Sequence, residues 1–244
     1  MKDVKFTVKS NTEIAKNVYK MTLSGDISEI TAPGQFVNLK IDGLYLRRPI
    51  SVNDAENGVL TLIYKVVGVG TEKMSKAREG DVFDILTGLG NGYNTEKSGD
   101  APVLLGGGVG VPPLYMLAKK LISEGKKVSV VIGFNKAEEV FGEEDFKALG
   151  ADVTVATVDG SLGEKGFVTD YLPENYSYFY TCGPEPMLRA VYRATKTSGQ
   201  MSFEERMGCG FGACMGCSCK TVTGYKRICK DGPVLEKEEI LWAD

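Results

Sequence analysis

Four cysteines near the end of the chain limit what this sequence can fold into. Cys209, Cys214, Cys217 and Cys229 have the spacing C-x4-C-x2-C, followed after eleven further residues by the last cysteine. This is the ligand spacing of plant-type [2Fe–2S] proteins, in which four thiolates converge on two irons. Glycines separate these cysteines and allow a tight loop, because glycine adopts backbone angles that other residues avoid. We therefore expect the four thiolates to bind a [2Fe–2S] cluster.

Two other uses of these cysteines remain open. A structural zinc site ordinarily shows paired C-x2-C knuckles, and here only Cys214 and Cys217 form such a pair. Disulfides need an oxidising compartment, of which the sequence carries no sign. Cys219 is a fifth thiol in the same stretch. We expect its side chain to point away from the cluster.

The absence of histidine excludes several kinds of chemistry. Without it there is no Ser–His–Asp triad, no HExxH zinc protease and no Rieske-type ligation. Electron or hydride transfer by bound cofactors is favoured instead. The net charge of −3 argues against nucleic acid or an acidic membrane as a partner. No apolar run approaches the length of a membrane span, and we expect a soluble, cytoplasmic protein.

The pattern of the first part of the chain predicts a small antiparallel β-barrel. Residues 1–98 contain several short alternating runs separated by turn signals, including Pro33-Gly34 and the hairpin signal Asn57-Gly58. One short helix is expected at residues 70–77. The chain is long enough for more than this one domain.

The pattern changes after a polar linker at residues 98–102. Buried strands then alternate with amphipathic helices, which predicts a doubly wound parallel α/β domain over residues 99–198. Residues 199–244 form a third, small module around the cysteines. A piece of this size builds little core without a metal to tie it. The predicted fold is therefore multi-domain, with a β-barrel, an α/β domain and a [2Fe–2S] module.

Two stretches of the predicted barrel are candidates for binding phosphate. Arg48 begins the sequence R-P-I-S, and a later strand leads into Gly70-Thr71 at the start of the predicted helix. Backbone N–H groups at a helix N-terminus favour phosphate, and an arginine can bind it from another side. Taken alone, R-P-I-S is more typical of a surface turn.

Together these stretches resemble the FAD site of the ferredoxin reductase superfamily. The resemblance implies that the arginine contacts the flavin pyrophosphate and that Ser51 lies near the reactive edge of the flavin ring. Many members have an aromatic residue where this chain has Ile50. The implied FAD-binding residues are Arg48, Pro49, Ile50, Ser51, Ile63, Tyr64, Lys65, Gly70 and Thr71.

Two motifs of the α/β domain are candidates for binding a nicotinamide nucleotide. A glycine-rich turn at residues 106–110 and the sequence C-G-P-E-P-M at residues 182–187 each follow a predicted strand, and ligands bind at the carboxyl ends of such strands. Tight strand–helix packing would also explain the glycines. The superfamily resemblance implies that the two motifs bracket the nucleotide and that Cys182 lies near the hydride path. A buried structural thiol is the alternative.

The implied NAD-binding residues are Gly107, Gly108, Gly110, Cys182, Gly183 and Pro184. With the flavin serine, this gives Cys182 and Ser51 as the candidate catalytic residues. No basic cluster for a 2′-phosphate follows the later strands, and Asp159 stands where a ribose-binding acid could lie. This favours NAD over NADP.

The cysteine-rich stretch resembles one family within the superfamily. E-E-R-M-G-C-G-F-G-A-C-M-G-C (204–217) and K-R-I-C-K-D-G-P-V (226–234) are similar to the electron-transfer subunit of NAD-dependent, type B dihydroorotate dehydrogenases. The resemblance covers essentially the whole chain. It implies an oxidoreductase subunit of pyrimidine biosynthesis that passes electrons from the FMN of a catalytic subunit, through the cluster and FAD, to NAD+. It also implies a heterotetramer of two catalytic and two electron-transfer subunits.

Two alternative functions remain. One is an FAD and [2Fe–2S] subunit of another NAD(P)H-dependent complex, of the transhydrogenase, sulfhydrogenase or sulfite reductase type. Transhydrogenase-type subunits are expected to replace a cluster cysteine with aspartate, whereas this chain has four cysteines. The other is a non-enzymatic metal or redox adaptor. If the chain is the electron-transfer subunit of a dihydroorotate dehydrogenase, we expect the catalytic subunit to dock around Met207, Phe211 and Met215.

Overall fold

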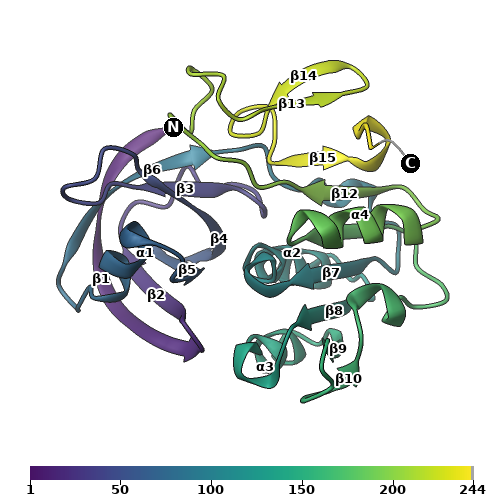
Figure 1. Cartoon of the computed structure of the whole chain (residues 1–244). Helices are drawn as coiled ribbons and strands as arrows, with labels where there is room; N and C mark the ends of the chain where they lie inside the picture. Colours follow the sequence, from purple (N-terminus) through teal and green to yellow (C-terminus); the bar gives the residue numbers. More distant parts are fainter. Residues whose placement is uncertain (243–244) are drawn as a thin grey trace.

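A closed six-stranded antiparallel barrel forms the first part of the chain, in purple and blue at the left of Figure 1. The computed structural model describes residues 1–242, so residues 243–244, the end of the predicted cluster module, lie outside the described part. The strand order is β1-β2-β5-β4-β3-β6, and β6 pairs with β1 to close the barrel. The predicted barrel is confirmed. Its strands are β1 (Lys2–Ala15), β2 (Val18–Ser24), β3 (Phe36–Leu39), β4 (Arg48–Glu56), β5 (Val59–Lys65) and β6 (Val82–Leu89).

The local signals of the barrel fold as the sequence predicts, with one addition. Asn57 and Gly58 join β4 to β5 with φ of 53° and 74°, the left-handed angles that two-residue hairpins require. The predicted short helix is α1 (Val69–Ser75). The addition is β4 itself, which runs through R-P-I-S, where no strand was predicted.

Alternation along β5 decides which side chains face which lobe. Leu60, Leu62 and Tyr64 belong to the buried cluster inside the barrel. Ile63 points the opposite way and packs into the core of the second lobe. This follows from the two-residue period of a strand, and it makes β5 a wall shared by both lobes.

A seven-stranded sheet forms the second lobe, in the order β10-β9-β8-β7-β11-β12-β15. All its pairings are parallel except that of β12 with β15. The chain runs outward from β7 to β10 and then returns to the other side of β7, so the strand order reverses between β7 and β11. The strands are β7 (Val103–Gly107), β8 (Ser129–Phe134), β9 (Asp152–Thr157), β10 (Glu164–Lys165), β11 (Phe179–Cys182), β12 (Gly199–Ser202) and β15 (Val234–Glu236).

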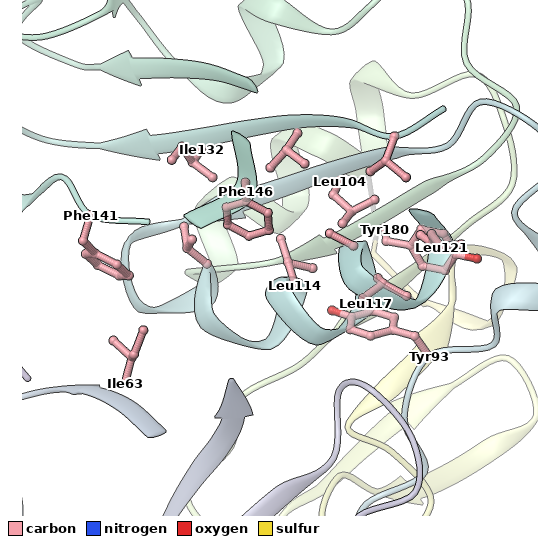
Figure 2. Close-up of a cluster of buried hydrophobic side chains, with 14 of the residues drawn as sticks. Ile63, Tyr93, Leu104, Leu114, Leu117, Leu121, Ile132, Phe141, Phe146 and Tyr180 are labelled. Atoms are coloured by element: carbon pink, nitrogen blue, oxygen red, sulfur yellow. The ribbon is translucent and has the colours of Figure 1, made fainter. Parts of the chain in front are cut away.

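Helices cover both faces of this sheet, as a doubly wound fold requires. Helices α2 (Pro112–Ser123) and α3 (Glu143–Ala148) pack on one face, where Figure 2 shows Leu114, Leu117 and Phe146 against Leu104 and Ile132. Helix α4 (Glu185–Ala194) packs on the other face. The predicted α/β domain is confirmed. Within residues 1–242, no helix has both the length and the apolar character needed to cross a bilayer.

The cysteine-rich part lies over the top of both lobes, in yellow in Figure 1. Between β12 and β15, at residues 203–233, its secondary structure is one hairpin, formed by β13 (Ser218–Thr221) and β14 (Gly224–Arg227). Strands β12 and β15, which the sequence analysis places in the cluster module, are the last two strands on one side of the large sheet, with β15 at its edge. The division into 1–98, 99–198 and 199–244 stays a prediction, and its second boundary falls directly before a strand of this sheet.

Candidate functional site

The loop between β12 and β13 presents cysteine sulfurs to backbone N–H groups. Cys209 Sγ accepts from the N–H of Phe211 at 3.5 Å and of Ala213 at 3.2 Å, and Cys217 Sγ accepts from the N–H of Cys229 at 3.4 Å. The loop bends sharply at Gly210 and Gly212, whose φ angles are +80° and +92°. Only glycine reaches these angles readily, so these two glycines allow the turn that directs amides at sulfur.

The four predicted ligands form two pairs of thiols. Cys209 and Cys214 are within hydrogen-bonding reach of each other, and so are Cys217 and Cys229. Within residues 1–242, no three Cys, Asp or Glu side chains gather as the ligands of a single metal ion. A two-iron cluster does not require such a group, because each iron takes two of the four thiolates. The paired arrangement therefore fits [2Fe–2S] better than zinc.

The surroundings of Cys209 favour its thiolate. Burial opposes ionisation, but the backbone N–H groups of Cys214 and Phe211 outweigh it and lower the pKa of Cys209 to about 6. In the other pair, burial and the adjacent Cys217 thiol raise the pKa of Cys229 to about 12. That proton must leave when a metal binds, since thiolates are the ligands.

The cluster loop has one exposed side and one buried side. Cys217 and Cys229 are buried, Cys209 is half-buried and Cys214 is exposed. Phe211 and Met215 are exposed, whereas Met207 packs inward; docking of a partner around these three residues stays a prediction. Cys219 is half-buried on β13 and belongs to neither thiol pair.

Polar side chains fasten the cluster loop to its surroundings. Arg227 donates to the carbonyl of Gly212 at 3.0 Å while its guanidinium pairs with Asp231 at 2.9 Å. Asn91, at the end of the barrel, donates to the carbonyl of Val234 at 2.7 Å and accepts from the same residue's N–H at 3.1 Å. These contacts hold the two ligand-bearing segments together and seat them on the barrel.

The predicted FAD residues lie where the barrel wall opens. Strands β4 and β5 pair only up to Val52 and Leu62. Beyond that point β4 pairs with β3 and β5 pairs with β2, so residues 48–51 and 63–65 face each other without a shared ladder. Unpaired strand edges offer backbone donors and acceptors to a ligand. This gap fits a flavin held by main-chain contacts.

The phosphate end of this site is built from Arg48 and the start of α1. A Cβ on Gly70 would lie 2.1 Å from Arg48 Nε, so only glycine lets the guanidinium lie there. The hydroxyl of Thr71 accepts from the N–H groups of Val67 and Gly68 at 3.0 and 3.3 Å. In this geometry Thr71 orders the turn rather than offering a free hydroxyl.

The motif residues of β4 and β5 divide between two faces. Pro49 and Ser51 lie opposite Asn38 and Phe36 of β3, and opposite residues share a face. That face is covered by the cluster module, since Phe36 packs with Cys217 and Cys229. Ile50 packs into the barrel core instead, so its side chain does not cover a flavin face there.

Strand β5 divides in the same way. Tyr64 is buried in the barrel, and its hydroxyl donates to Asn11 Oδ1 at 3.0 Å. Ile63 packs toward the second lobe, where Lys65 pairs with Glu139 at 3.2 Å. The side chain of Tyr64 therefore has a structural role in the barrel core, and its assignment to the flavin site stays a prediction for the backbone.

The predicted nicotinamide motifs meet at the point where the strand order reverses. One follows β7 and the other follows β11, the adjacent strands at this switch point, where ligands of open α/β sheets bind. The two loops are in direct contact. A Cβ on Gly110 would lie 2.3 Å from the carbonyl oxygen of Cys182, and one on Gly107 would lie 2.4 Å from Met187 Sδ. A Cβ on Gly183 would also be too close, at 2.7 Å from Met187 Cε.

These glycines thus have a packing role, which was the alternative to nucleotide binding. Gly108 differs from them. Its φ is +52° and no atom lies within 4 Å of where its Cβ would be, so it alone of these four borders open space. Pro184, which precedes α4, packs against Gly107 at 3.2 Å from that glycine's hypothetical Cβ.

Cys182 is half-buried at the carboxyl end of β11. Burial raises its pKa to about 12, and the Ser202 hydroxyl beside it only partly offsets this. The thiol is therefore neutral at pH 7, which suits a neighbour of nicotinamide and disfavours a nucleophile. Tyr93, fully buried next to Ser202, donates to the carbonyl of Thr181 at 3.0 Å. Asp159 is exposed and accepts from Ser161.

One buried hydrogen bond connects the strand that carries Ser51 to the helix that follows the glycine turn in contact with Cys182. Asn53, two residues after Ser51 on β4, donates to the carbonyl of Pro112 at 3.1 Å. Pro112 begins α2 directly after the glycine turn that contacts Cys182. Sequence reasoning missed Asn53, together with Asn38, Tyr93 and Ser202. No motif marks them, and only the meeting of distant strands brings them to the site.

Comparison with known proteins gives a consistent family. The iron–sulfur cluster binding domain of dihydroorotate dehydrogenase B matches residues 204–241. The dihydroorotate dehydrogenase B (NAD(+)) electron transfer subunit of Bacillus pumilus is 45% identical, and the match covers 98% of both chains. The corresponding subunit of Fusobacterium nucleatum is 44% identical over 93% of this chain and 94% of its own length.

Solved structures show the same architecture. An NADH-dependent reduced ferredoxin-NADP oxidoreductase, described for flavin-based electron bifurcation, superposes with a TM-score of 0.87 at 29% identity, over 97% of this chain and 90% of that one. A ferredoxin NADP+ reductase from Neisseria gonorrhoeae shares the fold over 80% of this chain and 91% of that chain, with a TM-score of 0.67 at 16% identity. By these full-length relationships, the chain belongs to the family of dihydroorotate dehydrogenase B (NAD(+)) electron transfer subunits.

Proposed function

We propose that this chain carries electrons from a dihydroorotate-oxidising catalytic subunit to NAD+, with the three sites acting in the order cluster, flavin, nicotinamide. The observation that carries the proposal is the order of contacts. The thiol loop packs on the outer face of β3, β3 pairs with the R-P-I-S strand β4, and β4 is hydrogen-bonded to the start of α2 at the switch point. When bound, the cluster supplies one-electron transfer and FAD couples it to two-electron exchange with nicotinamide.

The chain's own residues position these groups. Arg48 and the N–H groups at the start of α1 bind the flavin pyrophosphate, and the open edges of β4 and β5 bind the ring and ribityl chain. Gly108 and the loop from Cys182 to Pro184 line the nicotinamide nucleotide. The neutral Cys182 thiol and Ser51 flank the hydride path and exclude water from it. We assign Asp159 to the ribose, which makes NAD+ the nucleotide.

The exposed side of the cluster loop is the entrance for electrons. Cys214, Phe211 and Met215 are exposed there, and apolar side chains beside a redox centre suit a protein partner. We propose that the FMN-containing catalytic subunit docks at this surface, in a heterotetramer of two plus two. Thiolate ligands need a reducing compartment, so we place the complex in the cytoplasm.

One alternative has specific support. The structural similarity to the ferredoxin-NADP oxidoreductase named above extends over nearly the whole chain. That similarity is expected of any FAD and [2Fe–2S] subunit with this architecture. The higher identity to dihydroorotate dehydrogenase subunits, and the presence of all four cysteines, favour the first function.

Co-expression with a dihydroorotate-oxidising catalytic subunit from the same organism would test the proposal. The purified complex should contain FMN, FAD and a [2Fe–2S] cluster and should reduce NAD+ when dihydroorotate is added. The isolated chain should hold FAD and the cluster and should pass electrons from NADH to an artificial dye. A chain that binds flavin and iron but forms no dihydroorotate-oxidising complex would favour the alternative.

A further inference from the structure

A buried asparagine lies between the cluster loop and the strand assigned to the flavin. Asn38 is only 2% exposed, on β3 of the barrel. Its Nδ2 donates to the carbonyl of Cys209 at 3.5 Å, so one end of the amide faces the cluster loop. Its Oδ1 has no hydrogen-bond partner. Among the described residues, only one other buried side-chain atom, Thr197 Oγ1, shares this property.

The loop is shaped around this amide. Gly210 follows Cys209 with φ of +80°, and a Cβ there would lie 2.4 Å from Asn38 Nδ2. Any larger residue would push the amide away from the loop. The β3 backbone is also fixed, because Arg47 donates to the carbonyl of Asn38 at 3.3 Å and to that of Asp84 at 3.1 Å. The side chain is thus held on a rigid strand against a loop that only glycine permits.

The strand register places Asn38 beside the flavin residues. It lies directly opposite Pro49, and Phe36 lies opposite Ser51, on the face that the cluster module covers. Opposite residues have Cβ atoms about 4.5–5.5 Å apart. The amide is therefore one strand away from the flavin-binding part of β4 and in contact with the cluster loop at the same time.

Burying an amide oxygen without a donor is costly, so the free Oδ1 points to a bound group that donates to it. A [2Fe–2S] cluster has no N–H or O–H, whereas a flavin has an imide N–H and ribityl hydroxyls. Resting on the flavin assignment above, we propose that Asn38 is a positioning residue that bridges the two redox sites: its Nδ2 anchors the cluster loop and its Oδ1 accepts a hydrogen bond from the flavin.

Two substitutions of Asn38 in the full chain test the bridge. Asn38→Leu keeps the volume and removes both hydrogen bonds, and Asn38→Ser is too short to span them. Each variant should weaken FAD binding about tenfold, the effect of losing one such hydrogen bond. Each should also release iron to a chelator several-fold faster. Flavin fluorescence on dilution and chelator absorbance measure the two effects without any assay of turnover. Thr197→Val removes the other unpartnered atom, far from both sites in the sequence, and should change neither quantity.

The outcomes separate the two ends of the amide. Faster iron loss with unchanged FAD affinity would overturn the bridge, because the free oxygen would then have no role toward flavin. Weaker FAD binding with unchanged iron release would overturn the loop anchor, and so would wild-type behaviour in both assays. If Asn38→Leu does not fold, Asn38→Ser decides. If the wild-type chain binds no FAD, the proposed function fails first, and that result is read from the wild-type protein alone.

Discussion

The cysteine ligands differ in exposure, and this makes their roles testable one residue at a time. Cys214 is exposed and Cys219 is half-buried outside both thiol pairs. Cys214→Ser should lose the cluster, and dihydroorotate-driven NAD+ reduction in the complex should fall at least about 100-fold, because removing a ligand costs more than disturbing its surroundings. Cys219→Ser is the matched control and should keep its iron. Iron content and electron paramagnetic resonance of the reduced protein give the answer.

The same pair of variants tests whether the sites work separately. Electron transfer from NADH to a dye needs only FAD and the nucleotide site, so Cys214→Ser should retain most of this activity. Loss of dye reduction in Cys214→Ser would contradict independent sites. Loss of iron in Cys219→Ser would show that the ligand assignment is wrong.

Substitution of Gly70, compared with substitution of Gly68, tests whether Arg48 binds the flavin pyrophosphate. A Cβ at Gly70 meets Arg48 Nε at 2.1 Å, whereas a Cβ at Gly68 meets no atom within 4 Å, and Gly68 has an ordinary extended φ of −177°. Gly70→Ala should displace the guanidinium and weaken FAD binding about tenfold, as the loss of a charge-assisted hydrogen bond predicts. Gly68→Ala should bind FAD almost as the wild type does. Equal effects in the two variants would remove Arg48 from the pyrophosphate site.

At the scale of elements, Asn53 connects the barrel to the helix that begins at the nicotinamide site. It is 6% exposed and donates to the carbonyl of Pro112. Asn53→Leu removes this hydrogen bond, while the helix still supplies the Pro112 carbonyl with its own donor, so the change should cost about 0.5–1.5 kcal/mol of stability. Because this hydrogen bond fixes the position of α2 relative to β4, its loss should slow the stopped-flow reduction of FAD by NADH. The iron content should stay normal.

Lys119 provides the control for that experiment. It also joins α2 to β4, through Asp54 at 3.0 Å and Glu56 at 2.7 Å, but it is one-third exposed. Ion pairs of this kind contribute at most about 1 kcal/mol. Lys119→Met should therefore leave the rate of flavin reduction unchanged. A slower rate in Lys119→Met than in Asn53→Leu would locate the coupling in the ion pairs.

Strand β15 contains a carboxylate that makes folding depend on pH. Burial raises the pKa of Glu236, but hydrogen bonds from Lys97, Gln200 and Tyr178 outweigh it and leave the pKa below its ordinary value. A folded-state pKa below the unfolded one contributes stability above the unfolded value of about 4.3, and this is lost as pH falls through the folded value. Glu236→Gln should therefore unfold at a lower temperature than the wild type at pH 7.

The difference between these two proteins should shrink as the pH falls below about 4.3. Thermal melts at a series of pH values, followed by circular dichroism, measure it. Glu238→Gln, an exposed carboxylate two residues further on, serves as the control and should melt like the wild type throughout. A constant difference between Glu236→Gln and the wild type at all pH values would show that the hydrogen bonds do not depend on ionisation.

These elements also show what the sequence could and could not predict. The hairpin at Asn57-Gly58 and the cysteine spacing are local signals: the hairpin is confirmed, and so is an iron–sulfur binding domain, while the individual ligands stay a prediction. Ile50 and Tyr64 were assigned to FAD by motif, but the side a strand residue faces depends on register, and both side chains point into the barrel. The pairing of β12 with β15 joins residues far apart in the chain. No local pattern carries that information.

At the scale of the whole molecule, a buried asparagine lies at each of the two boundaries that separate the three sites. The cluster loop meets the barrel at Asn38, and the barrel meets the α/β lobe at Asn53. Each of these side chains is buried and lies one or two residues from a predicted flavin contact on the same strand or the adjacent one. Strands β3 and β4 thus link the cluster loop to the α/β lobe through two buried side chains.

The fold predicts which part of the cluster module depends on iron for its structure. Between β12 and β15, where every residue is described, the one sheet is the β13–β14 hairpin, and an isolated hairpin is marginally stable in water. Strands β12 and β15, by contrast, pair within the seven-stranded sheet. Removing iron with a chelator under reducing conditions should therefore increase hydrogen exchange at residues 205–231, because metal binding and folding are coupled there.

The same experiment should leave the strands that flank the module protected. Residues 199–202 and 234–236 should exchange as slowly as in the iron-loaded protein, and so should the barrel strand β1, which serves as the internal control. FAD content should not change. Exchange that rises through the whole large sheet would mean that the cluster supports the α/β lobe as well, and the boundary of the iron-dependent unit would then lie well before residue 199. Mass spectrometry of peptides from the two forms distinguishes the two results directly.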